Sequence, residues 1–350
     1  MRKLLGIVLV GLALWLGAAL LSENPLPAAQ AGTFTSSTQC QECHPQVYAE
    51  WSESQHAQAW INEDVRAQAG ELPSGDFANK DCVACHSPRP IFGTGLGKRV
   101  LPRSSRRSEG VDCLACHQIP ADQGGGMAGT LSNKSAACNP QPRLELQRVE
   151  YCGVCHNQHK TVDQFVGSPA DERGEDCLSC HMPFRQGDPN LGRIHSMHGG
   201  HSLDLVKTAV ALRAERSGNN TVRVEVENVF GGHSFPTDER SRAADVFWRP
   251  APTGADGPLL DAKGGNGWRH LDRMRSPYRN ETDIPDTLLL RDETRILTID
   301  NPDAAGPVQV ALYYKLAPYY RDPETGEALA TETVDTPDMD ANLVHQVSVE

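Results

Sequence analysis

Cysteine and histidine recur together five times along the chain in the pattern C-x-x-C-H. In each copy two thiols lie about one helical turn apart, and the residue after the second thiol is a histidine. Two thiols at this spacing can add across the two vinyl groups of one porphyrin, and the adjacent imidazole can bind its iron. The pattern is the attachment signature of a c-type haem. The copies are Cys40 to His44, Cys82 to His86, Cys113 to His117, Cys152 to His156 and Cys177 to His181.

The sequence therefore predicts five covalent haem c groups. Their attachment residues are Cys40, Cys43, Cys82, Cys85, Cys113, Cys116, Cys152, Cys155, Cys177 and Cys180, and their proximal ligands are His44, His86, His117, His156 and His181. A disulfide scaffold, zinc sites or thioredoxin-like pairs would not require a histidine directly after every second cysteine. The eleventh cysteine, Cys138, is left as a free thiol, a partner in an intermolecular disulfide or an unusual thiolate ligand.

Further histidines could bind the second axial position of each iron. The run from Pro45 to Gln68 has the pattern of one helix, on which His56 would lie roughly 18 Å along the axis from His44, too far to share its iron. His159 follows His156 on the same helical face, so it either reaches a neighbouring haem or lies at the surface. His56 is likewise a ligand of another haem or a packed or surface histidine.

Two later segments hold more candidates. His195, His198 and His201 precede or flank a Gly-Gly pair that would let the backbone approach a cofactor closely, and at least one of them should bind haem iron, His195 or His201 first. Zinc is the alternative for this cluster, although all nearby thiols are already committed. His233, between Gly-Gly and Ser-Phe-Pro, either ligates a haem of the preceding domain or is a structural turn histidine.

The chain divides into three parts. Residues 1–31 have the charged, apolar and Ala-x-Ala segments of a signal peptide, although the apolar run from Leu4 to Leu21 is nearly long enough for an uncleaved anchor. Residues 32–202 would form an irregular, mostly helical haem domain. Residues 203–350 contain no cysteine and alternate with period two in six runs, which predicts an antiparallel β-sandwich of about seven strands. The predicted fold class is α+β. The expected strands lie within Leu205–Leu212, Thr221–Val229, Ala244–Trp248, Thr294–Ile299, Val308–Leu316 and Val344–Val349.

Composition agrees with an exported, cofactor-rich protein. Aromatic residues make up only 6% of the 350 residues, which is little for a large side-chain core, and buried macrocycles would fill the difference. Removal of residues 1–31 leaves 31 basic and 44 acidic residues, a net charge of −13. This balance favours basic redox partners over nucleic acid, although ordinary solubility charge explains it equally well.

These segments together resemble the multihaem cytochromes c related to the small tetrahaem cytochrome of nitrifiers, hydroxylamine oxidoreductase and octahaem tetrathionate reductase. The resemblance spans roughly residues 38–245 and rests on CHPQVYAEWSESQHAQAW, Gly110-Val111-Asp112 before CLACH, CLSCHMP, IHSMHGGH and GGHSFPTDERSR. It implies distal ligand roles for His56 and His195, although Ile194 and Met197 replace a usual Ser and Phe. Gly232 to Asp238 resembles a family G-H-x-x-P-T-G loop in the C-terminal β domain, with Asp in place of the last Gly.

We expect an electron carrier with bis-histidine haems, because His56, His159, His195 or His198, His201 and His233 would supply five distal ligands. No catalytic residue is predicted. The alternative is an oxidoreductase acting on a small nitrogen or sulfur oxyanion at one open iron. The expected location is the periplasm or the cell exterior, with or without an N-terminal membrane anchor. The expected partners are other redox proteins, basic or membrane-bound and quinol-linked, and the chain could also join an oligomer or filament.

Overall fold

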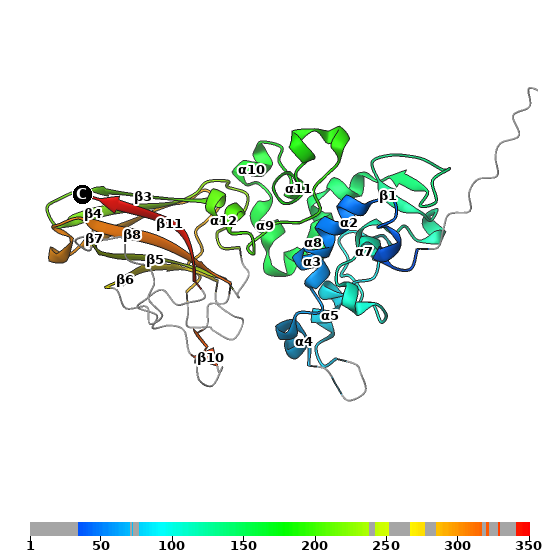
Figure 1. The fold of residues 1–350 in the computed structure, drawn as a ribbon, viewed down its shortest axis with the longest axis horizontal. Helices are drawn as coiled ribbons and strands as arrows, with labels where there is room; N and C mark the ends of the chain where they lie inside the picture. Colours follow the sequence, from blue (N-terminus) through cyan, green and yellow to red (C-terminus); the bar gives the residue numbers. More distant parts are fainter. Residues whose placement is uncertain are drawn as a thin grey trace, which may run out of the picture.

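The computed structural model describes residues 34–70, 72, 77–237, 242–251, 267–276, 285–316, 320–321, 328–329 and 341–350 (Figure 1). Short helices occupy the N-terminal part, and a four-stranded and a three-stranded sheet form the C-terminal part. The predicted α+β class is confirmed. Residues 1–31, where a signal peptide or anchor is expected, lie outside the described residues, and the proposed boundary at residue 203 coincides with the start of α12 (Leu203–Ala209).

The helices are short and are joined by turns and 3₁₀ segments. The α-helices before α12 are α2 (Pro45–Ser52), α3 (Gln55–Gln58), α4 (Glu63–Ala69), α5 (Lys80–His86), α6 (Ile91–Thr94), α7 (Cys113–His117), α8 (Val149–His156), α9 (Thr161–Phe165), α10 (Pro169–Glu172) and α11 (Cys177–His181). The 3₁₀ helices are η1 (Ser37–Gln39), η2 (Arg107–Glu109), η3 (Ala121–Gln123), η4 (Leu144–Gln147), η5 (Asn157–His159), η6 (Arg185–Gly187), η7 (Pro189–Leu191) and η8 (Pro302–Ala304). Among the described residues, none of these helices has the length and apolar character needed to span a bilayer.

The single helix predicted over residues 45–68 is wrong, because the chain breaks it into three. The first stretch ends at Ser52, and Ser54 is the N-cap of α3, where its side chain accepts a hydrogen bond from Ala57 N. A serine at this position competes with the helix for backbone hydrogen bonds and favours a new start.

Seven strands form the two antiparallel sheets. The strand order is β11-β8-β5-β6 in one sheet and β3-β4-β7 in the other. The strands are β3 (Val210–Arg216), β4 (Thr221–Asn228), β5 (Ala243–Pro250), β6 (Arg269–Met274), β7 (Thr294–Asp300), β8 (Val308–Lys315) and β11 (Ala341–Val349). Two small sheets add β1 (Met127–Gly129) with β2 (Pro140–Pro142), and β9 (Tyr320–Arg321) with β10 (Ala328–Leu329).

Two details of the strand prediction need correction. The run Leu205–Leu212 is mostly helix, because Ser202 caps α12 and the strand starts only at Val210. Strand β6 was not expected from its polar sequence. It pairs with β5, and its polar residues Arg273 and His270 both contact Asp245 of that strand.

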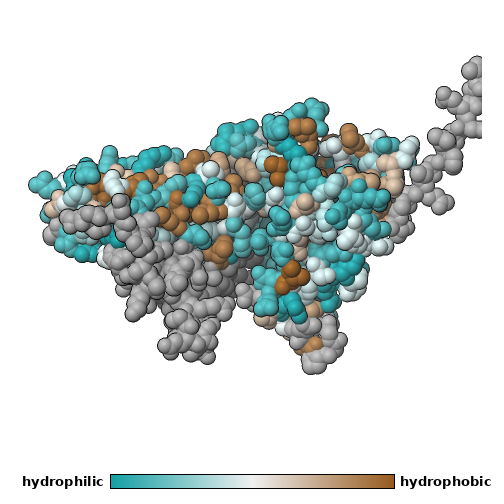
Figure 2. Space-filling model, viewed as in Figure 1, coloured by the Kyte–Doolittle hydropathy of each residue, from teal (hydrophilic) through white to brown (hydrophobic). Residues whose placement is uncertain are grey.

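Apolar packing is concentrated in the sandwich. The largest cluster joins the inward residues of both sheets, including Val222, Val224 and Leu312, whereas the helical part has only small clusters around motif cysteines such as Cys85, Cys116 and Cys155. On the face shown in Figure 2, hydrophilic residues cover most of the helical part. A domain whose side chains form little core of their own is expected where an apolar group supplies the missing volume.

The loop between β4 and β5, together with Arg291 from the segment between β6 and β7, docks the sandwich onto the helices. Ser234 N donates to Gln164 Oε1 at 3.1 Å, and Arg291 Nη1 donates to the Val166 carbonyl at 3.0 Å. Arg173 Nη2 donates to the Phe230 carbonyl at 2.9 Å. These bonds place His233, which lies within this loop, against the helical part.

Candidate haem-binding site

Four of the five motifs form short helices, and the first forms consecutive turns. Asn79, Asp112 and Asp176 cap three of these helices with their side chains. In the first motif, Cys43 N and His44 N both donate to the Cys40 carbonyl. One helical turn places the two thiols on the same side and the following histidine beside them. This is the arrangement that thioether attachment and proximal ligation would require.

Three motif histidines face a second histidine from another part of the chain. The ring centroids lie 6.0 Å apart for His156 and His56, 6.3 Å for His117 and His195, and 6.3 Å for His181 and His233. A metal–nitrogen bond of about 2 Å on each side, plus roughly 1 Å from each nitrogen to its ring centre, gives about 6 Å for two imidazoles on one metal. The three pairs thus fit bis-histidine iron.

Four of these six rings, and the ring of the second motif's His86, are oriented by a hydrogen bond from Nδ1 to a backbone carbonyl. A carbonyl can only accept, so Nδ1 carries the proton and the lone pair of Nε2 is available for a metal. The bonds are His86 to Ala59 at 3.0 Å, His117 to Ala128 at 2.8 Å, His181 to His198 at 2.6 Å, His195 to Arg193 at 2.9 Å and His233 to Ser234 at 3.0 Å. The His56 ring differs, because its Nδ1 contacts the Met197 sulfur.

Burial keeps the facing histidines neutral. Burial, together with the neighbouring His156, lowers the pKa of His56 to about 3. Burial also lowers the pKa of His195 to about 4 and that of His233 to about 4, with further lowering from the facing motif histidine in each case. Burial lowers the pKa of His117 as well. Neutral imidazole is the form that binds metal ions.

Cysteines of different motifs lie side by side, so the motifs form one connected array. Thiol hydrogen bonds join Cys40 to Cys113, Cys85 to Cys155 and Cys152 to Cys177, and each raises the pKa of one thiol and lowers that of the other. The Tyr151 hydroxyl, which precedes the fourth motif, donates to the carbonyl of Cys116 in the third. The first motif therefore adjoins the third, and the fourth adjoins the second, third and fifth. No disulfide joins any of the eleven cysteines, which all lie among the described residues.

Close backbone packing positions His56. Val111 N donates to the His56 carbonyl at 2.8 Å, and Trp51 Nε1 donates to the Val111 carbonyl at 2.9 Å. Gly110 has a φ of +57°, and a Cβ added there would lie 2.3 Å from the His56 carbonyl oxygen. A side chain cannot be accommodated at this glycine without moving the turn that holds His56.

A carboxylate that the sequence did not single out positions His195. Glu50 accepts two hydrogen bonds from Arg185, at 2.9 and 2.8 Å, and a third from His195 N at 2.8 Å. Its position in a predicted helix gave no signal of this role, because Arg185 and His195 lie far away in the sequence. Glu50 thus ties α2 to the segment that follows the fifth motif.

The other histidines predicted as iron ligands do not form facing pairs among the described side chains. His201 is exposed, and its Nε2 lies 3.0 Å from Arg242 Nη2. This nitrogen accepts a hydrogen bond from the arginine and does not face a motif histidine. His198 contributes its carbonyl to His181, and the choice among the three histidines falls on His195. His44 is exposed, and within the described side chains it faces no second histidine ring. The side chain of His159 lies outside the described ones.

The zinc alternative finds no support in the described part of the chain, where no three His, Cys, Asp or Glu side chains converge on one point. Structural zinc needs four ligands and catalytic zinc three, whereas a haem iron needs two from the protein. The histidines meet in pairs.

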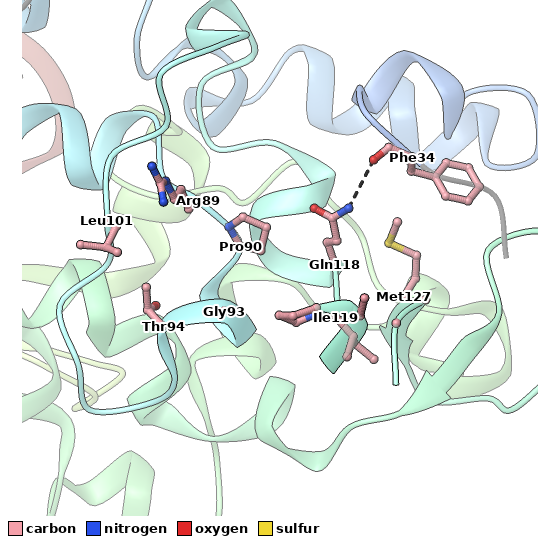
Figure 3. A pocket seen from close by; sticks show the side chains of 13 residues that line it. Phe34, Arg89, Pro90, Gly93, Thr94, Leu101, Gln118, Ile119 and Met127 are labelled. Carbon is pink, nitrogen blue, oxygen red and sulfur yellow. Dashed lines mark hydrogen bonds between the residues drawn. The ribbon is translucent and has the colours of Figure 1, made fainter. Parts of the chain in front are cut away.

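A hollow of about 560 Å³ adjoins the second and third motifs (Figure 3). Pro90 and Leu101 line it from the segment after the second motif, and Ile119 and Met127 from the segment after the third. Gln118 Nε2 donates to the Phe34 carbonyl at its rim. No cysteine or histidine of either motif lines this hollow, so it lies beside the two proposed attachment sites and is not itself one of them.

Comparisons with known proteins agree with this arrangement. Residues 39–118 match the family described as cytochrome c554 and c-prime, and this stretch contains the first three motifs and His56. The fold is similar to the crystal structure of a penta-heme cytochrome c552 from Thermochromatium tepidum, with a TM-score of 0.60 and 19% sequence identity over 90% of this chain and 98% of that chain. No curated protein matches the chain.

Proposed function

We propose that the chain is an exported pentahaem c-type cytochrome that carries electrons between redox partners. The observation that best supports this proposal is the three histidine pairs, because the ring spacing in each pair fits one iron. Each motif would hold one haem through its two cysteines and its histidine, and His56, His195 and His233 would be the distal ligands of the fourth, third and fifth haems. When bound, such a haem accepts and releases one electron at its iron.

The protein's own contribution is to orient and bury the ligands. Backbone carbonyls fix the ring tautomers, and the contacts among the motifs bring all five attachment sites into one array. Attachment sites that adjoin one another in this way support electron transfer from one haem to the next without a diffusing carrier. Two histidine ligands favour low potentials relative to a histidine and a methionine.

The distal ligands of the first and second haems remain predictions from the sequence. His44 and His86 are the proximal ligands proposed there, and His159 and His201 remain the distal ligands predicted from the sequence. A ligand role for His201 requires that its nitrogen leave Arg242.

Export and partners follow from sequence features. Covalent attachment to C-x-x-C-H and the apolar run in residues 1–31 support a periplasmic or extracellular location, with or without an N-terminal anchor. The acidic balance supports basic or membrane-bound, quinol-linked redox partners and disfavours nucleic acid. We also propose that the chain is related to hydroxylamine oxidoreductase and octahaem tetrathionate reductase. Assembly into an oligomer or filament is a further part of the proposal.

The alternative is an oxidoreductase for a small nitrogen or sulfur oxyanion. Within the described side chains His44 faces no second histidine ring, and this favours the alternative, because a haem held by Cys40, Cys43 and His44 would then keep one axial position for a small anion. Electron paramagnetic resonance of the purified oxidised protein distinguishes the two. Only low-spin signals, unchanged by nitrite or cyanide, support the carrier. A high-spin signal that either anion removes supports the oxidoreductase.

A further inference from the structure

One short segment touches the axial histidines of three proposed haems. His195 is itself a facing histidine, the Met197 sulfur contacts His56 Nδ1, and the His198 carbonyl accepts from His181 Nδ1 at 2.6 Å. The third, fourth and fifth sites therefore share four consecutive residues of the chain. A side chain within them that changes a ligand's hydrogen bond would act on an iron through that ligand.

The backbone conformation at Met197 and the contacts of the residues after it shape this segment. Met197 has a φ of 48°, in the left-handed region that few residues adopt. Beyond it, a Cβ added to Gly200 would lie 2.4 Å from the Tyr314 hydroxyl, so this turn is pressed against β8. Next, Arg242 joins His201 to the Leu316 carbonyl. These contacts hold the chain just after Met197 against the β-sandwich.

The acceptor at His56 differs in kind from the acceptors at five other histidines. Backbone carbonyls accept the Nδ1 proton of His86, His117, His181, His195 and His233. A thioether sulfur is only a weak acceptor. A strong acceptor at Nδ1 makes an imidazole more basic and therefore a better donor to its metal, which favours the ferric state. With sulfur in that place, His56 stabilises ferric iron less.

We propose that Met197 is a positioning residue that raises the reduction potential of the haem held by His156 and His56. This inference rests on the proposed function. The fourth motif adjoins the second, third and fifth motifs, so a raised potential there would collect electrons where the array branches. The residue acts through His56 and does not touch the iron.

The test compares Met197→Gln and Met197→Leu with the unaltered holoprotein in a spectroelectrochemical titration that resolves the five one-electron potentials. Glutamine offers an oxygen acceptor of similar length, so one potential should fall by about 59 mV, a tenfold change in that site's reduction constant. Leucine offers no acceptor, so no potential should fall. The unaffected haems serve as internal controls. Met197→Asn repeats the test should the glutamine variant lose haem.

Three results would overturn the inference: no shift in the amide variants, an equal fall in the leucine variant, or a uniform shift of all five potentials. The last result would mean that the segment had merely loosened. Haem content and the low-spin spectrum of each variant are measured first. Five low-spin haems with an unmoved potential would refute the role of Met197 alone, whereas missing haem in the unaltered protein would refute the proposed function with it.

Discussion

Replacement of Glu50 by glutamine should destabilise the protein and disturb one haem. The carboxylate accepts two hydrogen bonds from Arg185 and one from His195 N, and the Arg185 and Glu50 side chains are only 13% and 18% exposed. Hydrogen bonds to a charged group contribute about 1.5–3 kcal/mol each, and loss of one partner leaves the arginine charge poorly compensated. Because the pair is not fully buried, we expect the free energy of unfolding to fall by about 2–4 kcal/mol in total.

Urea unfolding of the holoprotein, followed by the haem absorption band, measures this loss. The matched control is Glu175→Gln, which removes a carboxylate that also accepts two hydrogen bonds from one arginine but is paired at 50% and 38% exposure. Exposed pairs of this kind contribute about 0–1 kcal/mol. In the Glu50 variant the low-spin signal assigned to the His117 and His195 pair should also change. Equal unfolding midpoints in the two variants, with unchanged spectra, would refute the role assigned to Glu50.

Three further changes test other parts of the molecule. Gly110→Ala should abolish the low-spin signal of the fourth haem, because the added Cβ would lie 2.3 Å from the His56 carbonyl oxygen. The control Gly97→Ala, at φ +70° with no neighbour within 4 Å, should keep that signal. Equal spectra for the two variants would contradict this prediction. Burial alone would raise the pKa of Asp245, but hydrogen bonds from neighbouring side chains hold it below its usual range. Its stabilisation is therefore complete above the unfolded pKa of about 3.9 and is lost as the pH falls towards the lower folded pKa. Asp245→Asn should thus lower the urea midpoint at pH 7, and this difference should shrink only below about pH 4; a difference that already disappears at pH 6 would count against the assignment. His233→Ala should convert one low-spin haem to a high-spin one, and an unchanged resonance spectrum would exclude His233 as a ligand.

Local sequence patterns predicted the attachment sites and most strands. The C-x-x-C-H spacing is complete within five residues, and the alternation along Thr221–Asn228 reflects one buried face, as the structure has it. The helix over residues 45–68 failed because Ser54 caps a new turn, a signal weaker than the apolar pattern around it.

Long-range contacts explain what the sequence could not provide. His56 and His156 meet only after the chain folds, so the sequence offered candidate distal ligands without their pairing. Strand β6 went unrecognised because its polar residues face the buried Asp245 rather than solvent. In the sequence Glu50 is indistinguishable from a surface residue of a helix, because its partners Arg185 and His195 are distant along the chain.

The most direct measurement of the central claim is the haem content of the pure protein, by the alkaline pyridine absorbance per polypeptide after acid–acetone extraction of any haem that is not covalently bound. We predict five equivalents that remain with the chain, one for each C-x-x-C-H motif. Far fewer than five, or haem that is extracted from the chain, would contradict the account.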